Sequence, residues 1–310
     1  MDLETLETGL RRAVGRRKVT EDYVAASIES VLAQTMSDFE LVICDDRSSD
    51  GTVDIVRGFE RRDRRIRLSI NERNLGDYGN RRHVASQAQG RFLKYHDSDD
   101  VMYSHCLATM VEPLEAEPRA AFALTGPRSW PGGPCPMLLT PRLAYEREFL
   151  GSGLFQQGPA SGLFRADAFR ALGGFPEVTY AGDYLFWLRA CASVSVLLVP
   201  GDLFYYRIHP GQEVAKPESA IAYARAAGEA WRMLNSPQCP LTGDARELAK
   251  RNFVFTQARG VYRFLMRGRF QSAADIVSNI GVSPQDWVAH LRPPRRSPTA
   301  GTPVVAEEQP

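Results

Sequence analysis

The sequence predicts an α/β fold, in which a mostly parallel sheet carries helices on both faces and is followed by a helical extension. Three observations predict it. Strand-like and helix-like patterns alternate between residues 24 and 116, with spacers long enough for crossover helices. Two acidic clusters, Asp45-Asp46 and Asp97-Ser98-Asp99-Asp100, directly follow apolar runs, where the carboxyl ends of parallel strands place ligand-binding groups. Residues 217–291 have a helical pattern.

Apolar spacing and turn signals divide the first half of the chain into elements. Apolar residues at 24, 28, 31 and 32 share one face of a helix, and the apolar run 39–44 predicts a buried strand. Residues 48–51 form a turn and an N-cap, and Gly90 is expected to end a helix as its C′ residue. The expected helices span about 24–32, 52–62, 77–89 and 104–116, and the expected strands 39–44, 66–70 and 92–96.

The second half alternates less regularly. Four prolines and three glycines within residues 126–136 predict a loop. The Pro-rich, polar residues 292–310 predict a disordered tail. Strands are expected over 161–165, 194–199 and 203–208, and short helices over 166–172 and 182–192.

Composition limits the classes of function. The chain has 310 residues and a mass of 34.5 kDa, enough for one large domain or two small ones. A net charge of +1 argues against nucleic acid as a partner. No apolar stretch approaches the roughly 18 residues of a membrane span, and residues 1–20 lack the apolar centre of a signal peptide. Five scattered cysteines argue against a disulfide framework and indicate a reducing, cytoplasmic location.

Each acidic cluster has a functional and a structural interpretation. Carboxylates one residue apart, as in Asp97 and Asp99, can bind a hard divalent cation and, through it, phosphate oxygens. The same carboxylates can instead cap the helix that follows. Asp45 and Asp46 precede the residues S-S-D-G, so taken alone they are better explained by a turn and a helix cap.

Other ionisable side chains have similar alternatives. Arg81 and Arg82 lie on a predicted helix, where an arginine is either a fork for a diphosphate or a solvated surface residue. Asp183 is either a general base or an acid favoured by the dipole at a helix start. His209 is either a ligand or an ordinary loop histidine. The order of all these positions along the chain is more informative than any one of them.

That order resembles the family 2 glycosyltransferases, which are inverting enzymes with the GT-A fold. The resemblance covers about residues 21–213 and is specific to the family, though not to any sugar. The segments that carry it are E-S-V-L-A-Q-T at 29–35, F-E-L-V-I-C-D-D-R-S-S-D-G-T at 39–52, N-L-G at 74–76 followed by Arg81, G-R-F-L-K-Y-H-D-S-D-D at 90–100, G-G-F at 173–175, G-D at 182–183 followed by W-L-R at 187–189, and Y-R-I-H at 206–209.

The resemblance implies roles on the donor side of a site. Asp46, with Asp45 beside it, would recognise the base or ribose of a nucleotide. Arg81 would contact the diphosphate. Asp97 would contact the ribose or the surroundings of a metal ion, as the first member of the D-x-D pair.

It also implies a metal site and a base. Asp99 would bind a divalent metal, Mn²⁺ or Mg²⁺, with Asp97 and His209 as further ligands. Asp183 would take the proton of the acceptor hydroxyl. A metal and an arginine neutralise the charge of a leaving diphosphate, and a base opposite the leaving group gives a single displacement with inversion.

The function so implied is transfer of a sugar from a nucleotide-diphospho-sugar to an acceptor hydroxyl, in polysaccharide or glycoconjugate biosynthesis. The acceptor would be a saccharide or lipid-linked, and the enzyme cytoplasmic, with peripheral contact at the inner face of a membrane. The expected divisions are a basic N-terminal segment 1–20, a GT-A domain 21–216, a helical extension 217–291 and the tail 292–310. The Gln-x-x-Arg-Trp motif of processive members is absent, which favours one sugar per encounter.

Two departures from the family pattern keep alternatives open. The family's first strand has no counterpart, because residues 10–19 hold five basic residues and no apolar run. Gly182 stands where the family usually has an acid before the base. A GT-A-like binding protein, catalytically impaired by loss of the first strand, is therefore the main alternative. A sugar-phosphate nucleotidylyltransferase fits less well, because the short G-R-R-K at 15–18 follows no strand.

Overall fold

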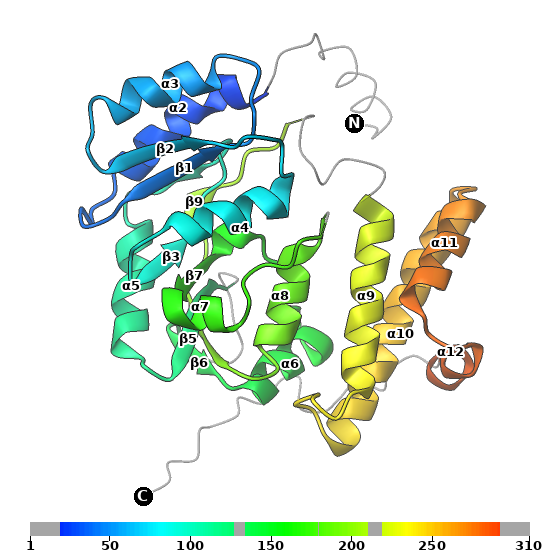
Figure 1. Ribbon diagram of the computed structural model, residues 1–310. Coiled ribbons are helices and arrows are strands. Elements are labelled where there is room, and N and C mark those ends of the chain that lie inside the picture. Colours follow the sequence, from blue (N-terminus) through cyan, green and yellow to red (C-terminus); the bar gives the residue numbers. More distant parts are fainter. Residues whose placement is uncertain (1–18, 127–133, 179, 210–218, 292–310) are drawn as a thin grey trace, which may run out of the picture.

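The computed structural model describes residues 19–126, 134–178, 180–209 and 219–291 (Figure 1). The expectations for nearly all of the basic segment 1–20, for most of the loop 126–136 and for the tail 292–310 lie outside the described residues.

A five-stranded mixed sheet forms the centre of the molecule. Its order is β3 (Phe92–Lys94), β7 (Gly162–Arg165), β5 (Ala120–Thr125), β8 (Ser195–Val199), β6 (Met137–Leu139). In this sheet β5 and β8 are parallel, whereas β3–β7, β7–β5 and β8–β6 are antiparallel. The prediction of a mostly parallel sheet is therefore wrong. Alternating patterns show that crossovers are possible, but they do not show that β7 inserts antiparallel between β3 and β5.

Two strands of this sheet and the helix α6 (Pro141–Leu150) were not predicted from the sequence. Strand β5 reads A-A-F-A-L-T, which contains little of the β-branched and aromatic signal typical of strands. Its central position decides its conformation instead, because Phe122, Ala123 and Leu124 are completely buried between neighbouring strands and two layers of helices. Tertiary packing overrides local propensity here.

Side chains alternate between two apolar layers, one on each face of the central sheet. Leu163 and Leu197 point into the layer that contains α5 (Cys106–Ala116). Phe122 and Leu198 point into the opposite layer, which contains α6, α7 (Ala166–Ala171) and α8 (Gly182–Ala190). The prediction of helices on both faces is confirmed.

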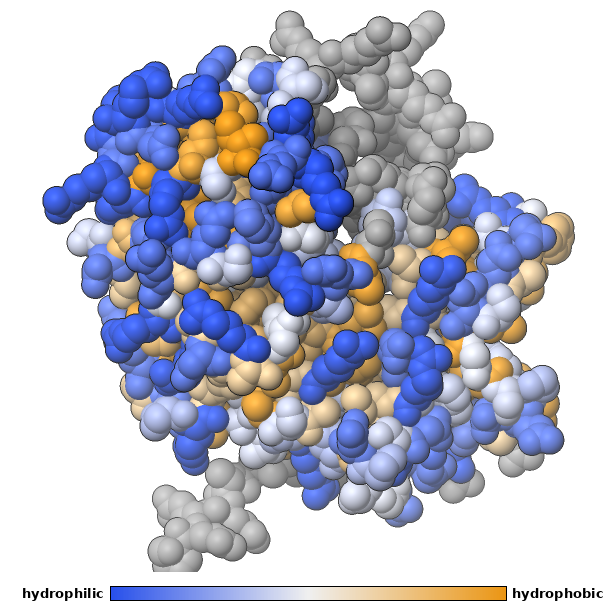
Figure 2. Space-filling view, in the orientation of Figure 1, coloured by the Kyte–Doolittle hydropathy of each residue, from blue (hydrophilic) through white to orange (hydrophobic). Residues whose placement is uncertain are grey.

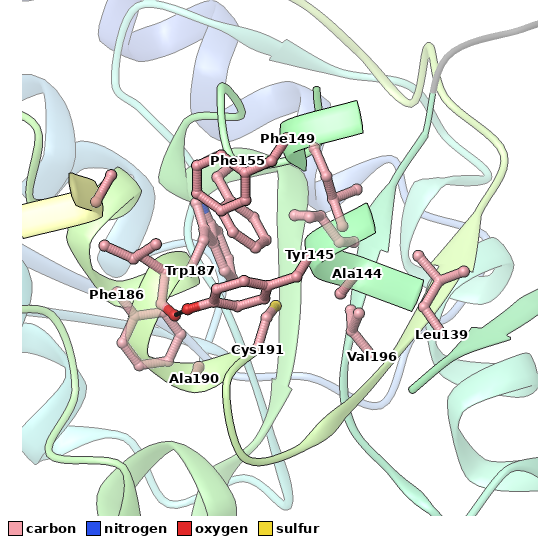
Figure 3. Close-up of a cluster of buried hydrophobic side chains, with 14 of the residues drawn as sticks. Leu139, Ala144, Tyr145, Phe149, Phe155, Phe186, Trp187, Ala190, Cys191 and Val196 are labelled. Atoms are coloured by element: carbon pink, nitrogen blue, oxygen red, sulfur yellow. Dashed lines mark hydrogen bonds between the residues drawn. The ribbon is translucent and has the colours of Figure 1, made fainter. Parts of the chain in front are cut away.

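Helix α8 is firmly held in the larger layer. The Trp187 ring stacks on Phe164 with centroids 5.5 Å apart, and the Trp187 indole N–H donates to the Gln157 carbonyl at 2.8 Å. The Tyr145 hydroxyl donates to the Leu188 carbonyl at 2.5 Å (Figure 3). These contacts fix the direction of α8, and therefore the position of Asp183 at its start.

A separate parallel pair consists of β1 (Leu41–Asp45) and β2 (Ile66–Ile70), with Leu41 opposite Ile66. Helices α2 (Val19–Leu32) and α3 (Thr52–Glu60) pack against it. Within the described residues no strand pairs with the other edge of β1, and residues 41–44 are only half-buried. The segment in which a first strand was sought, residues 10–19, lies almost entirely outside the described part of the chain.

Short elements surround the acidic segment 97–100 in the sequence or in space. Strands β4 (Val101–Met102) and β9 (Phe204–Tyr205) are antiparallel, which carries the residues after Tyr205 back toward residues 97–100. Helix α4 (Asp77–Gln87) ends earlier than expected, since Ala88 is already extended, so Gly90 is not its C′ residue. A single 3₁₀ turn, η1 (Pro159–Ser161), precedes β7.

The predicted helical extension is confirmed, and its helices are α9 (Ser219–Asn235), α10 (Gly243–Met266), α11 (Phe270–Ile280) and α12 (Pro284–His290). Helix α9 packs against α8 on one side and closely against α11 on the other. A Cβ at Gly228 would stand only 2.8 Å from the Asn279 carbonyl oxygen, so this crossing requires glycine. The extension is thus packed onto the helix that carries Asp183.

Candidate functional site

The two acids that end β1 organise loops. Asp45 is buried and accepts a hydrogen bond from the Ser48 N–H at 2.9 Å, so its side chain stabilises the turn over residues 45–48. Asp46 accepts from the backbone N–H groups of Leu75 and Gly76 at 2.7 and 2.9 Å. Gly76 has φ +75°, a left-handed backbone conformation that glycine adopts without strain. Glycine at position 76 therefore allows the loop to turn tightly around the Asp46 carboxylate.

A cavity of about 590 Å³ opens beside this loop. Asp46, Asn74, Asp77, Tyr78 and Tyr180 are among the residues that line it. Its walls therefore include the strand-end carboxylate and the first turn of α4.

Arg81 connects this cavity to the acidic segment. Its Nε donates to Asp77 at 2.7 Å, and another guanidinium nitrogen pairs with the Asp97 carboxylate at 2.7 Å. Burial by itself would raise the pKa of Asp97, but the Arg81 charge beside it holds that pKa below its usual value. Arg82 points outward and forms an exposed ion pair with Glu177, so the two adjacent arginines have different environments.

Asp99 and His209 meet at the opposite side of the acidic segment. The Asp99 Oδ2 and His209 Nε2 atoms are 2.7 Å apart, and the His209 side chain is 7% exposed. The Arg207 Nε donates to the Asp99 carbonyl, and the Arg207 N–H donates to Asp100. Burial raises the pKa of Asp100 to about 6, with the neighbouring charges of Asp97 and Asp99 adding to the effect.

The arrangement suits a divalent metal only in part. Two ligands at adjacent positions of an octahedral ion, bound at about 2.1 Å, stand about 3 Å apart, close to the Asp99–His209 separation. One carboxylate oxygen of Asp100 is buried without a hydrogen-bond partner among the described residues, so a bound cation would satisfy it. Within the described residues, however, no group of three or more candidate ligands gathers, and Asp97 is turned toward Arg81. The metal site stays a prediction, with Asp99 and His209 as its best-placed ligands.

Side chains of α2 and of the residues just after it hydrogen-bond to the backbone of the acidic segment and of the residues that follow it. The Ser27 hydroxyl donates to the Asp97 carbonyl at 3.2 Å, and the Ser30 hydroxyl accepts from the Met102 N–H at 2.9 Å. The Gln34 side chain bonds to backbone groups of residues 103 and 107. The motif E-S-V-L-A-Q-T therefore serves as a scaffold that fixes where the carboxylates of residues 97–100 stand.

Asp183 lies at the start of α8, near Tyr78. Its N–H donates to the Tyr78 hydroxyl at 2.9 Å, and its carboxylate accepts from the Tyr184 N–H at 2.8 Å. Burial raises the pKa of Asp183, although the Tyr184 N–H and the nearby Arg81 charge oppose the shift. A buried carboxylate with a raised pKa has a greater tendency to hold a proton, which suits a general base.

The structure explains the glycine before Asp183. A Cβ at Gly182 would stand 2.6–2.8 Å from ring atoms of Tyr78, so a larger residue would displace that ring. The two preceding residues, Tyr180 and Ala181, adopt left-handed backbone conformations with φ of 60° and 49°. Such strain at non-glycine residues is costly and is concentrated at functional sites in many proteins.

The predicted site residues form one chain of contacts. Asp46 touches the loop that begins α4, Arg81 on α4 pairs with Asp97, and Asp99 pairs with His209. Asp183 joins the group through Tyr78, whose ring lies 5.9 Å from the Arg81 guanidinium.

Sequence reasoning missed three residues of this group. Asp77 could have been found, because it precedes Arg81 by four residues on one helix. Tyr78 gives no local signal, since its partner is 105 residues away. Arg207 was seen only as part of the Y-R-I-H motif, although it contacts both Asp99 and Asp100.

Fold and site together place the chain among α/β proteins in which a half-buried arginine on a helix pairs with an acidic segment that follows a strand. Residues 16–172, about half of the chain, match the family model described as glycosyl transferase family 2. The chain belongs to the family 2 glycosyltransferases.

Relatives of known sequence are similar over a shorter stretch. One is the UDP-Glc:α-D-GlcNAc-diphosphoundecaprenol β-1,3-glucosyltransferase WfgD of Escherichia coli, 42% identical over 94 residues, which is 30% of this chain and 36% of WfgD. Another is the GalNAc(5)-diNAcBac-PP-undecaprenol β-1,3-glucosyltransferase of Campylobacter jejuni, 33% identical over 87 residues, 28% of each chain. The matched stretch spans less than half the length of these curated relatives.

Solved structures show the same fold over most of the chain. S. aureus TarS, residues 1–349, has a TM-score of 0.64 at 19% identity and covers 89% of this chain and 79% of its own. The mannosyltransferase PcManGT from Pyrobaculum calidifontis, in complex with GDP-Man and Mn²⁺, has a TM-score of 0.56 at 16% identity, with coverage of 89% and 82%. At such low identity these likenesses show the GT-A-like fold alone.

Proposed function

We propose that this protein transfers a hexosyl group from a nucleotide-diphospho-sugar to an acceptor hydroxyl, with inversion at the sugar's anomeric carbon. The observation that carries the proposal is the linked group Arg81–Asp97 beside the Asp46 cavity, with the half-buried Asp183 joined to it through Tyr78. A fixed cation, a cluster of carboxylates and a carboxylate of raised pKa are the groups that this reaction needs.

Each residue then has a defined task. Asp46 shapes the loop that would receive the nucleoside, and Arg81 would offer its guanidinium to the diphosphate. Asp99 and His209 would hold Mn²⁺ or Mg²⁺, which supplies charge neutralisation to the leaving diphosphate when bound.

The chemical step depends on Asp183. The acceptor oxygen forms a bond to the anomeric carbon while the bond from that carbon to the diphosphate oxygen breaks. The hydroxyl proton passes to the Asp183 carboxylate, and the nucleoside diphosphate leaves with the bonding electrons. A single displacement of this kind inverts the anomeric carbon.

The relatives support an acceptor class. WfgD and the Campylobacter enzyme are named for undecaprenol diphosphate acceptors, and TarS has been crystallised with UDP-GlcNAc. We therefore propose a UDP-hexose donor and a saccharide carried on a polyprenyl diphosphate as the first substrates to test, in glycoconjugate or polysaccharide biosynthesis.

A screen of UDP- and GDP-sugars, with and without Mn²⁺, tests the proposal. Release of nucleoside diphosphate that is saturable in one donor and depends on the metal is the expected result. A folded chain that neither binds nor cleaves any donor would contradict it.

A binding protein without turnover is the second candidate. It is favoured by one observation, the edge of β1 that pairs with no strand in the described part of the chain. Tight donor binding without release of nucleoside diphosphate, in the presence of acceptor and metal, would select this candidate.

A further inference from the structure

The turn between α10 and α11 exposes clustered apolar side chains. Tyr262, Leu265, Met266 and Phe270 are 61%, 41%, 68% and 68% exposed, respectively. Scattered apolar residues are normal on a surface, but a cluster of them marks an interaction site. We name residues 262–270 the α10–α11 tip.

The tip is also strongly basic. Arg263, Arg267 and Arg269 are exposed within it, and no Asp or Glu occurs between Arg259 and Ala274. The whole chain carries a net charge of only +1, so this excess is local. Figure 2 shows hydrophobic and hydrophilic side chains interleaved over the side of the molecule formed by α9–α11.

This mixture fits an anionic bilayer better than a protein partner. Protein interfaces are also enriched in aromatic residues, methionine and arginine, but they pair charges of opposite sign across the contact. The tip carries three arginines and no acid, so its charge is complementary to an anionic lipid surface. Here arginines alternate with apolar side chains, so aromatic and aliphatic groups can enter the headgroup–acyl boundary while guanidinium groups reach lipid phosphates. No helix among the described residues has the length and hydrophobicity to cross a bilayer, so the contact would be peripheral.

The tip lies at the same end of the helical extension as the start of α9 (Figure 1). Arg225 on α9 bonds to Asn279 on α11, so the two helices run side by side from that end. The first turns of α9 add the exposed side chains of Ile221 and Tyr223 to the same end.

This end is also close to the candidate base. Ala226 on α9 packs with Ala181 and Leu185, which flank Asp183. A cavity of about 720 Å³ is lined by Tyr184, the residue after Asp183, and also by Phe264 within the tip. One cavity is therefore lined both by the neighbour of the candidate base and by a residue of the tip.

We propose that the α10–α11 tip binds the surface of an anionic phospholipid bilayer. Lipid binding by the tip does not depend on the proposed glycosyl transfer, because it needs neither donor nor turnover. The two proposals can therefore fail separately.

Co-sedimentation of the full chain with vesicles tests this surface. The wild-type protein is expected to pellet with vesicles of equimolar phosphatidylcholine and phosphatidylglycerol, much less with phosphatidylcholine alone, and less as salt is added. The double variant Met266→Ser, Phe270→Ser should weaken binding by about tenfold or more. Arg263→Gln and Arg267→Gln should each weaken it about fivefold.

Val288→Ser is the matched control, since Val288 on α12 is 76% exposed but lies outside the tip. It should bind vesicles like the wild type, and all variants should keep the wild-type circular dichroism. Absence of wild-type binding to anionic vesicles would overturn the proposal, as would an equal loss in Val288→Ser. Concentration-dependent self-association that the double variant abolishes would assign the tip to a second copy of the chain and overturn it too.

Discussion

Arg81 and Asp97 are joined by a 2.7 Å ion pair, although one lies on α4 and the other follows β3. The pair links the loop held by Asp46 to the segment that contains Asp99. It also places a cation within electrostatic reach of Asp183. The proposed donor side and the proposed acceptor side of the candidate site therefore share one charged centre.

Removing the guanidinium should both destabilise the protein and weaken donor binding. Arg81→Gln leaves the half-buried Asp97 and the more exposed Asp77 without their partner, at a cost of about 1–3 kcal/mol in the free energy of unfolding. Denaturant unfolding and UDP titration measure the two effects. Arg82→Gln is the control, because its exposed pair with Glu177 should contribute less than about 0.5 kcal/mol. Equal losses in both variants would contradict the special role of Arg81.

Asp99→Asn should abolish the metal-dependent part of nucleoside diphosphate binding while leaving the fold intact. The amide oxygen is a much weaker ligand for a hard cation than the carboxylate, but it keeps the size of the side chain. Calorimetric titration of UDP with and without Mn²⁺ measures the difference. Unchanged metal-dependent affinity in the variant would remove Asp99 from the site.

Gly182→Ala should destabilise the protein by about 1–3 kcal/mol, because the new Cβ overlaps the Tyr78 ring. Gly260→Ala provides a control of opposite sign. No atom of the described residues outside α10's own backbone lies within 4 Å of the position that a Cβ at Gly260 would occupy, so alanine there should stabilise by up to about 1 kcal/mol. Thermal unfolding of both variants measures these changes in stability. If Gly182→Ala left the stability unchanged, the Tyr78 ring would be free to move, which would contradict this prediction.

Turnover should depend on pH through Asp183. Burial raises the pKa of this carboxyl, and the base must be ionised, so kcat/KM should fall as the pH drops through that raised pKa. The acid limb should therefore lie above the range of an ordinary aspartate. A pH–rate profile checks this, with donor affinity measured at each pH as the control. An acid limb at the ordinary aspartate pKa would contradict the burial argument.

The sequence identified residues that the fold brings together, but it did not predict the order and direction of the strands. Asp46, Arg81, Asp97, Asp99, Asp183 and His209 stand in ordered motifs, and the structure connects all six, but their chemical roles remain proposals. Strand β5 escaped prediction because its alanine-rich sequence has no strand signal and depends on burial between β7 and β8.

Long-range contacts account for the other failures. Tyr78 meets Asp183 only after the chain has crossed the sheet several times, so no spacing rule identifies it. Strand order has the same origin, since nothing near β7 indicates that it lies antiparallel between β3 and β5. A sequence motif reflects interactions between residues that are close in the chain, whereas these pairings depend on how the whole domain packs.

The most direct test compares Asp183→Asn with the wild type in one preparation, measuring transfer, donor affinity and melting temperature together. The amide can still accept the Tyr184 N–H hydrogen bond, so the fold should persist, but it cannot take the acceptor's proton. We expect transfer to fall by roughly 10² to 10⁴-fold while donor affinity and melting temperature stay close to wild type. Near-normal transfer, with only a small loss of stability, would show that Asp183 merely starts a helix and would contradict the proposed mechanism.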